Sequence, residues 1–245
     1  MKNYSPRAKT RRQSRHLPAV IALGYLCVAL LLFYSAGVAP TSTNLPLSGH
    51  VFVVDAGHGG TDGGAVGVNG TVEAPLNLSV AYFLAEELRK QGAEVIMTRL
   101  DGAAIAETKR EDMQKRQDIM GQSGITAAIS IHMNNHTEPT PSGPRVFYQE
   151  GSTSSKALAA VVQSDLDAAV GEKTRTPTAG DYMVLDTDNT SVLVECGFLS
   201  NPDDEQRLNT ESYQRLLATT VAQTMAQYFG VRADFPVFLK ESARD

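Results

Sequence analysis

The chain has 245 residues, of which 42% are hydrophobic and 20% charged, enough for one globular domain with its own core. Six of the 22 Lys and Arg lie in the first 15 residues. The rest of the chain therefore has 16 Lys and Arg against 27 Asp and Glu, a net charge of about −11. This charge argues against nucleic acid or anionic lipid as a partner of the main domain. The two cysteines, Cys27 and Cys196, are too few and too differently placed for a disulfide framework.

The first 48 residues predict a targeting segment followed by a linker. Residues 1–18 form a basic tail, and residues 19–39 are an uncharged apolar run of 21 residues. A run of this length is typical of a transmembrane helix or a long signal peptide. Because Pro40 hinders cleavage after the small residues before it, we expect an uncleaved anchor, a linker at 40–48 and a domain outside the cytoplasm. Secretion after cleavage is the alternative.

Residues 49–230 alternate between strand and helix patterns. Short apolar runs predict strands at 51–55, 94–98, 127–132, 145–149, 182–185 and 191–196. Amphipathic spacing predicts helices at 76–90, 109–120, 155–170 and 211–229. This order predicts a single α/β domain with a mainly parallel twisted sheet flanked by helices, followed by a polar tail at 231–245.

Two histidines fall at the ends of predicted strands. His58 follows strand 51–55 in the glycine-rich segment DAGHGGTDGGAVG, and His132 ends strand 127–132. Taken singly, they are interpreted more simply as part of a tight turn and as a buried, hydrogen-bonded residue. Because ligands gather at the carboxyl ends of strands in α/β sheets, however, the two histidines are expected to face one crevice.

Two glutamates complete the candidate site. Glu73 stands at the mouth of helix 76–90, where a helix-start carboxylate is the simpler interpretation. Together with two imidazoles, it forms a donor set that holds zinc and leaves one position for water. Glu195 lies in the apolar run SVLVECGF, where an unpaired carboxylate is costly, and it has the character of a general base. Cys196 points to the other side of that strand and is interpreted as a packed residue.

Four motifs resemble, in order and spacing, those of the zinc-dependent N-acetylmuramoyl-L-alanine amidases: DAGHGGTDGGAVG, a helix-opening glutamate, SIHMN and LVECGFLSNPDDEQRL. The resemblance covers residues 49–230 and implies hydrolysis of the amide between muramic acid and L-alanine in peptidoglycan. It assigns His58, Glu73 and His132 as the zinc ligands. It also assigns Glu195 as the catalytic glutamate, which takes a proton from water and returns it to the alanine nitrogen.

The sequence departs from the family pattern in places that concern substrate contacts rather than the metal. Ala56 stands where proline usually precedes GHGG, Ala74 and Pro75 replace a basic pattern, and Asp186 stands where arginine is usual. Three further residues are candidates for substrate contact, although the arginines are expected to brace the sheet instead: Arg99, Arg116 and Asn134.

The single domain, its apolar N-terminal segment and the phrase LPLSGH resemble the germination-specific branch of the family. That resemblance implies action on spore cortex, where peptide removal permits muramic-δ-lactam formation. The alternatives are a general exported autolysin, a zinc peptidase that cuts the stem peptide, and a catalytically silent wall-binding or activator domain. Because no wall-binding repeat is recognised, a wall-associated or lipoprotein partner is expected to help the domain bind zinc or substrate.

Overall fold

The computed structural model describes residues 45–230, so the predicted basic tail, apolar segment and C-terminal tail lie outside the described residues. Packing of the domain begins at Leu47, which is fully buried just before the expected boundary at residue 49. Within the described part of the chain, no helix combines the length and apolar character needed to span a membrane. The anchor at 19–39 therefore stays a prediction.

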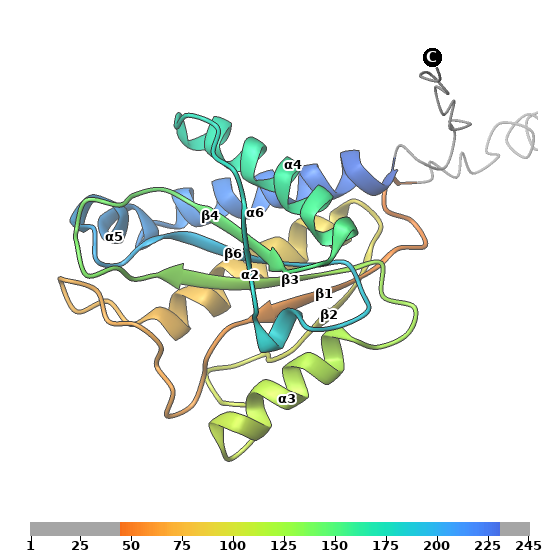
Figure 1. Cartoon of the computed structure of the whole chain (residues 1–245), viewed down its shortest axis with the longest axis horizontal. Coiled ribbons are helices and arrows are strands. Elements are labelled where there is room, and N and C mark those ends of the chain that lie inside the picture. The colour runs from red at the N-terminus through yellow and green to blue at the C-terminus, as the bar shows by residue number, and fades with distance from the viewer. Residues whose placement is uncertain (1–44, 231–245) are drawn as a thin grey trace, which may run out of the picture. The chain divides into compact units, whose positions relative to one another are not determined.

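Six strands form one sheet in the order β2-β1-β3-β6-β4-β5 (Figure 1). Their bounds are β1 Val51–Ala56, β2 Glu94–Met97, β3 Ala127–Asn134, β4 Arg145–Gln149, β5 Thr178–Gly180 and β6 Ser191–Phe198. Strands β2, β1, β3 and β6 are parallel, whereas β4 runs antiparallel to β6 and parallel to β5. The predicted α/β domain is confirmed, with a mixed sheet because of the reversal at β4.

Helices cover the two faces of the sheet unequally (Figure 1). The helices are α2 Glu73–Lys90, α3 Lys109–Met120, α4 Thr153–Val170, α5 Pro202–Leu208 and α6 Glu211–Met225, which continues as a π-helical turn, Ala226–Gly230. Helices α2, α4 and α6 pack together over one face, and α3 lies on the other. Alternation along the strands explains this division, since Phe52 and Val54 join the larger core and Val53 joins the smaller one beside α3.

The expected strand at 182–185 is wrong. Met183–Leu185 is a 3-10 turn, η1, whose Val184 and Leu185 are buried in the smaller core near α3. A run of four apolar residues is too short for its period to distinguish a strand from a helical turn. Neither β5 nor α5 is predicted from the sequence, although Asn201 directly precedes α5 and its side chain accepts two backbone hydrogen bonds as the N-cap.

Candidate metal centre

The carboxyl edge of the parallel strands gathers the four predicted site residues. His58 follows β1, while His132 in β3 is paired directly with Glu195 in β6. Glu73 is the first residue of α2, slightly before the expected start of that helix. The structure thus brings together the side chains that the sequence places at one crevice, because neighbouring parallel strands end at the same edge of a sheet.

His58, Glu73 and His132 present ligand atoms that all lie within 4.8 Å of one another. Nε2 of His58 is 3.3 Å from Oε2 of Glu73, and Nδ1 of His132 is 2.9 Å from Oε1 of the same carboxylate. The centroids of the two imidazole rings are 5.0 Å apart, and the rings are inclined at 76°. A carboxylate between two imidazoles fits the donor set of a catalytic zinc site, which keeps a further position for water.

Main-chain and amide groups hold the Glu73 carboxylate in place. Its Oε2 accepts a hydrogen bond from the backbone N–H of Ala65 at 2.8 Å. Its Oε1 accepts from the backbone N–H of Met133 at 3.1 Å and from Nδ2 of Asn77 at 3.0 Å. Burial alone would raise the pKa of Glu73, but the two histidines hold that pKa well below its usual range. The carboxylate is therefore ionised, as a metal ligand has to be.

Two glycines allow the cluster to close. A Cβ atom on Gly57 would stand 2.2 Å from the ring of His132, and a Cβ atom on Gly64 would stand 2.5 Å from Oε2 of Glu73. His58 itself has φ 60°, in the left-handed region that non-glycine residues seldom adopt. Such strain persists where the surrounding structure fixes it and is concentrated at functional sites.

Glu195 differs from Glu73 because one of its oxygens has no partner. The residue is half-buried, and its Oε2 atom is enclosed without a hydrogen-bond partner among the described residues. Burial is the main cause that raises the pKa of Glu195 to about 7, with His132 lowering it and Glu73 raising it. A carboxyl group of this kind accepts and releases a proton near neutral pH. Beside a three-donor cluster, it suits metal-assisted hydrolysis.

Comparison with known proteins decides the family. Residues 52–227 match the family described as N-acetylmuramoyl-L-alanine amidase. The chain belongs to this family. The resemblance seen in the motifs is thereby confirmed, and with it the assignment to hydrolases of this type.

Three of the similar proteins match over nearly their whole length. The germination-specific N-acetylmuramoyl-L-alanine amidase of Bacillus subtilis strain 168 is 32% identical over 226 residues, which are 87% of this chain and 95% of the relative. The CwlD amidase from Clostridioides difficile, solved in complex with the GerS lipoprotein, is 31% identical with a TM-score of 0.70, over 74% of this chain and 99% of that chain. The catalytic domain of CwlV from Bacillus (Paenibacillus) polymyxa var. colistinus is 31% identical with a TM-score of 0.66, over 73% and 97% of the two chains.

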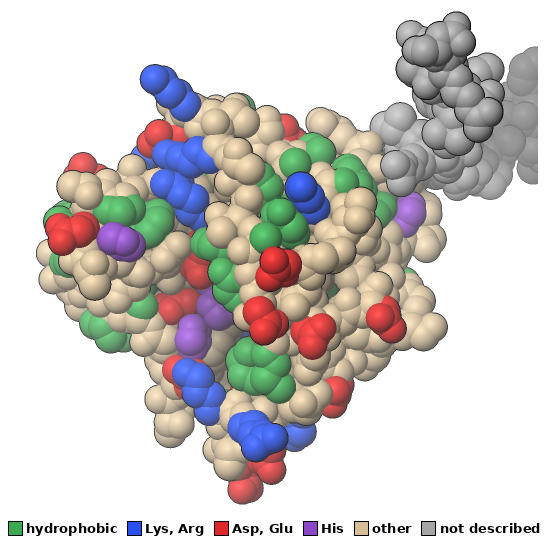
Figure 2. Space-filling view, viewed as in Figure 1, with side chains coloured by type: hydrophobic (Ala, Val, Ile, Leu, Met, Phe, Trp, Pro, Cys, Tyr) green, Lys and Arg blue, Asp and Glu red, His purple; other side chains and the backbone are tan. Residues whose placement is uncertain are grey.

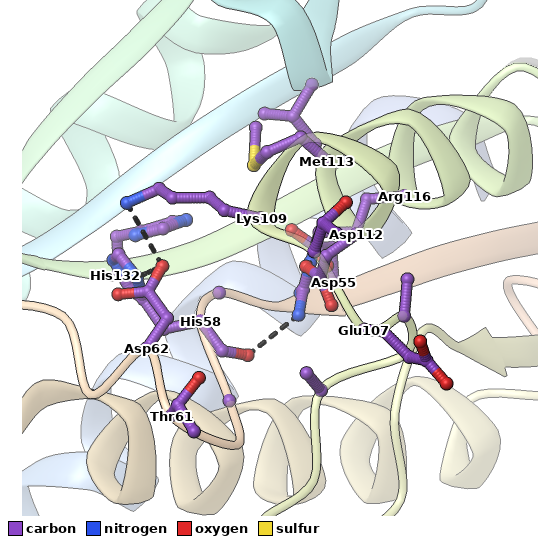
Figure 3. Close-up of a pocket in the computed structure, with 16 residues that line it drawn as sticks. Asp55, His58, Thr61, Asp62, Glu107, Lys109, Asp112, Met113, Arg116 and His132 are labelled. Atoms are coloured by element: carbon purple, nitrogen blue, oxygen red, sulfur yellow. Dashed lines mark hydrogen bonds and ion pairs between the residues drawn. The ribbon is translucent and has the colours of Figure 1, made fainter.

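Asp62 is a site residue that the sequence analysis missed. Its Oδ2 lies 3.0 Å from Nδ1 of His58, the ring nitrogen that does not face Glu73, and 3.1 Å from Nζ of Lys109 (Figure 3). Burial alone would raise the pKa of Asp62, but His58 and Lys109 lower it to about 2. An ionised acceptor on Nδ1 leaves Nε2 of His58 available to a metal. The available signal was an aspartate four residues after the histidine of a glycine-rich loop.

Arg99 and Arg116 were expected to brace the sheet, and they contact the end of β1 and the loop around His58. Arg99 donates hydrogen bonds to the main-chain carbonyls of Ala56, Gly57 and Ala74. Arg116 donates to the carbonyl of His58 at 2.7 Å and pairs with Asp55 at 2.7 Å (Figure 3). These contacts fix the backbone of the loop and involve no atom of the ligand set.

Three other predictions can be placed in the structure. Cys196 is a free, buried cysteine in the larger core, as expected. Asp186 follows η1 as an exposed residue whose carbonyl accepts a hydrogen bond from Gln117. Asn134 ends β3, and its Oδ1 accepts from the backbone N–H of Asn135 at 2.8 Å. Contact between Asn134 and substrate stays a prediction.

Proposed function

We propose that the domain hydrolyses the amide between N-acetylmuramic acid and L-alanine in peptidoglycan, with zinc held by His58, Glu73 and His132. Membership of the amidase family supports the reaction, and the donor set supports the metal. The observation that carries the proposal is Glu195, which offers an enclosed, unpartnered carboxyl oxygen beside His132. Zinc in such a site supplies a Lewis acid that acidifies water and polarises the scissile carbonyl.

The side chains supply proton transfer and positioning. Glu195 accepts the proton of the attacking water and then donates it to the leaving nitrogen of L-alanine, so that one carboxyl group acts first as base and then as acid. Asp62 holds the imidazole of His58 by Nδ1 and turns its other nitrogen toward Glu73. Arg116 fixes the main chain of the same loop through a hydrogen bond to the carbonyl of His58.

Metal analysis and product chemistry together test the reaction. The zinc-loaded protein would be incubated with purified peptidoglycan beside Glu195→Gln, and the products would be identified by mass spectrometry. We expect peptides that begin with L-alanine, and peptide-free muramic acid, only from the unmutated protein. Cleavage inside the stem peptide would instead establish the alternative, a zinc peptidase. A protein that binds no zinc would contradict the assignment of the three ligands.

The substrate in the cell is proposed to be spore cortex. The similarity to a germination-specific amidase supports this. Removal of peptide from muramic acid in cortex would then precede muramic-δ-lactam formation. Digestion of cortex and of vegetative wall by the same enzyme preparation tests the proposal. Equal rates on both would favour the general exported autolysin.

A lipoprotein partner and a membrane location complete the proposal. The CwlD structure contains the GerS lipoprotein, which supports a partner of this kind for the present chain. The apolar run at 19–39 supports an anchor with the catalytic domain outside the cytoplasm. Co-purification from membranes, and activity with and without the captured lipoprotein, test both points. Full activity of the isolated domain on cortex would contradict the need for a partner.

A further inference from the structure

A row of three side chains crosses the sheet at the metal centre. His132 of β3 is paired with Glu195 of β6, and Glu195 is paired in turn with Arg145 of β4. Side chains at directly paired positions point to the same face of a sheet. The next pair toward the sheet interior, Phe147 and Leu193, packs in the smaller core beside α3. Arg145 therefore shares the α3 face of the sheet with His132 and Glu195.

The guanidinium of Arg145 is held by one of its nitrogens. Nη1 donates hydrogen bonds to the carbonyl oxygens of Pro144 at 2.9 Å and Gly143 at 3.3 Å. The guanidinium carbon lies 5.3 Å from the ring centroid of Phe198, itself only 5% exposed. A guanidinium stacked on an aromatic ring keeps its plane and its remaining donors in a fixed orientation. Nε and Nη2 of Arg145 donate to no group in the described part of the chain.

The charge of Arg145 is also uncompensated at close range. Although the residue is half-buried, no carboxylate among residues 45–230 lies within ion-pair distance of it. The nearby acids are committed elsewhere: Asp167 and Glu172 pair with Arg175 at 2.6 and 2.9 Å. Asp204 accepts hydrogen bonds from the main chain of Gly143 and Phe198 and pairs with Arg207. Figure 2 shows Lys and Arg side chains above and below the histidines near the centre of the surface in view.

We propose that Arg145 forms an anionic subsite for the peptide part of the substrate, where it binds the α-carboxylate of the residue after L-alanine. This inference rests on the proposed amidase function. Paired residues in a sheet have Cβ atoms about 5 Å apart, and successive residues of an extended peptide advance by about 3.5 Å. The Cβ atom of Arg145 therefore lies about one peptide residue away from Glu195, which acts on the scissile amide. A guanidinium with two free donors suits a carboxylate and discriminates against a neutral amide.

Two matched substrates test the subsite. They are muramoyl peptides that differ only in whether the α-carboxyl of the D-glutamate after L-alanine is free or amidated. For Arg145→Gln, we expect kcat/KM on the free acid to fall about 10- to 100-fold, mainly through KM, because a charged hydrogen bond is lost. The amidated substrate should be cleaved by the variant and the unmutated protein at equal rates. Arg145→Lys should recover part of the loss, since it keeps the charge but not the fork.

The controls separate a subsite from a brace. Arg110→Gln removes an exposed arginine of α3 and should change neither substrate. If Arg145→Gln slows both substrates equally, Arg145 only braces the turn at Gly143 and Pro144, and the subsite is wrong. No change on either substrate would also overturn it.

Binding of the product peptide keeps the test independent of turnover. The zinc-loaded protein would be titrated with L-alanyl-D-glutamate and with its α-amide, each followed by calorimetry or NMR. The acid should bind more tightly, and the difference should vanish in Arg145→Gln. If the unmutated protein cleaves neither substrate, with or without the captured lipoprotein, the proposed reaction fails, whereas the titration still decides whether Arg145 selects a carboxylate. Equal binding of acid and amide would contradict the subsite.

Discussion

Two groups of buried charge lie next to each other beneath the glycine-rich loop, and they are satisfied in different ways. In the first, the wholly buried Asp55 pairs with Arg116 at 2.7 Å and accepts from the hydroxyls of Ser130 at 2.6 Å and Thr98 at 2.7 Å. In the second, the candidate metal centre, Glu73 lies between two imidazoles and Glu195 keeps an oxygen without a partner. In the first group every charge has a partner within the protein, whereas in the second the carboxyl groups are expected to gain their remaining partners from a cation and a substrate.

The pKa values of the carboxylates express the same difference. Burial would raise the pKa of Asp55, but Arg116 and the two hydroxyls outweigh burial and hold that pKa below its usual range. No lysine or arginine in the described part of the chain forms an ion pair with Glu195, and burial raises its pKa to about 7. A buried acid that the fold pairs with arginine is therefore structural, and one that the fold leaves unpaired is a candidate for chemistry.

The strongest test of this contrast is Glu195→Gln. The substitution keeps the shape of the side chain and removes the proton carrier, so kcat should fall between about 10²- and 10⁴-fold. Zinc content, measured by metal analysis, should not change, because Glu195 is outside the ligand set. Glu150→Gln, at an exposed glutamate, is the matched control. Retention of more than a tenth of the activity would mean that another group transfers the proton.

Asp55→Asn tests the self-sufficient group. It leaves the charge of Arg116 buried without a full partner, so the free energy of unfolding should fall by about 3–5 kcal/mol in denaturant titrations. Asp118→Asn on the exposed side of α3 is the control and should change stability little. A loss below about 1 kcal/mol would show that Asp112 and the carbonyls of Ala56 and His58 compensate the arginine.

The pH dependence of stability should have opposite signs for the two groups in the metal-free protein. Asp55 has a lowered folded pKa, so its contribution is present above its ordinary pKa of 3.8 and is lost as the pH falls below that value. Glu195 has a folded pKa of about 7 against an ordinary 4.5, so the folded state binds more protons and stability falls as the pH rises between these values. The full effect is about 3 kcal/mol.

Glu195→Gln isolates the contribution of Glu195 to the pH dependence of stability. Relative to the unmutated protein, the variant should gain stability steadily from pH 4.5 to 7 and show a constant advantage at higher pH. Urea unfolding at several pH values, with chelator present, measures the difference between the two proteins. A difference that does not change with pH would mean that the pKa of Glu195 is not raised.

Asp62→Asn probes how the fold orients a ligand. Asparagine can present its amide nitrogen to Nδ1 of His58 and thereby stabilise the wrong tautomer. We expect zinc affinity to fall about 10- to 100-fold in competition with a chelating dye, with little change in thermal unfolding of the metal-free protein. The exposed Asp118→Asn again serves as the control. Unchanged affinity would show that His58 is oriented by its own backbone.

Sequence patterns predicted which residues meet at the candidate metal centre better than they predicted its surroundings. Parallel strands end at one edge, so residues that follow two strand runs, such as His58 and His132, could be brought together without coordinates. Asp62 and Lys109 could not, because their contact depends on the path of a loop in which His58 takes φ 60°. The antiparallel direction of β4 could not be predicted either, because the pattern of a short strand does not indicate which strand it pairs with or in which direction. The strand predicted at 182–185 is wrong for a similar reason, since four residues are too few to distinguish a strand from a helical turn.

Lys109→Gln should have the smallest effect of these substitutions, a small loss of zinc affinity. Its side chain is 72% exposed and that of Asp62 is 34% exposed, whereas the Arg116–Asp55 pair is 2% and 0% exposed. Exposed ion pairs contribute up to about 1 kcal/mol and are screened by salt, so Lys109→Gln should lower zinc affinity less than about fivefold. That small loss should disappear in 1 M salt, whereas the loss in Asp62→Asn should persist, because a directed hydrogen bond is less screened than a distant charge. Equal losses in the two variants would mean that Asp62 holds His58 only when Lys109 is paired with it.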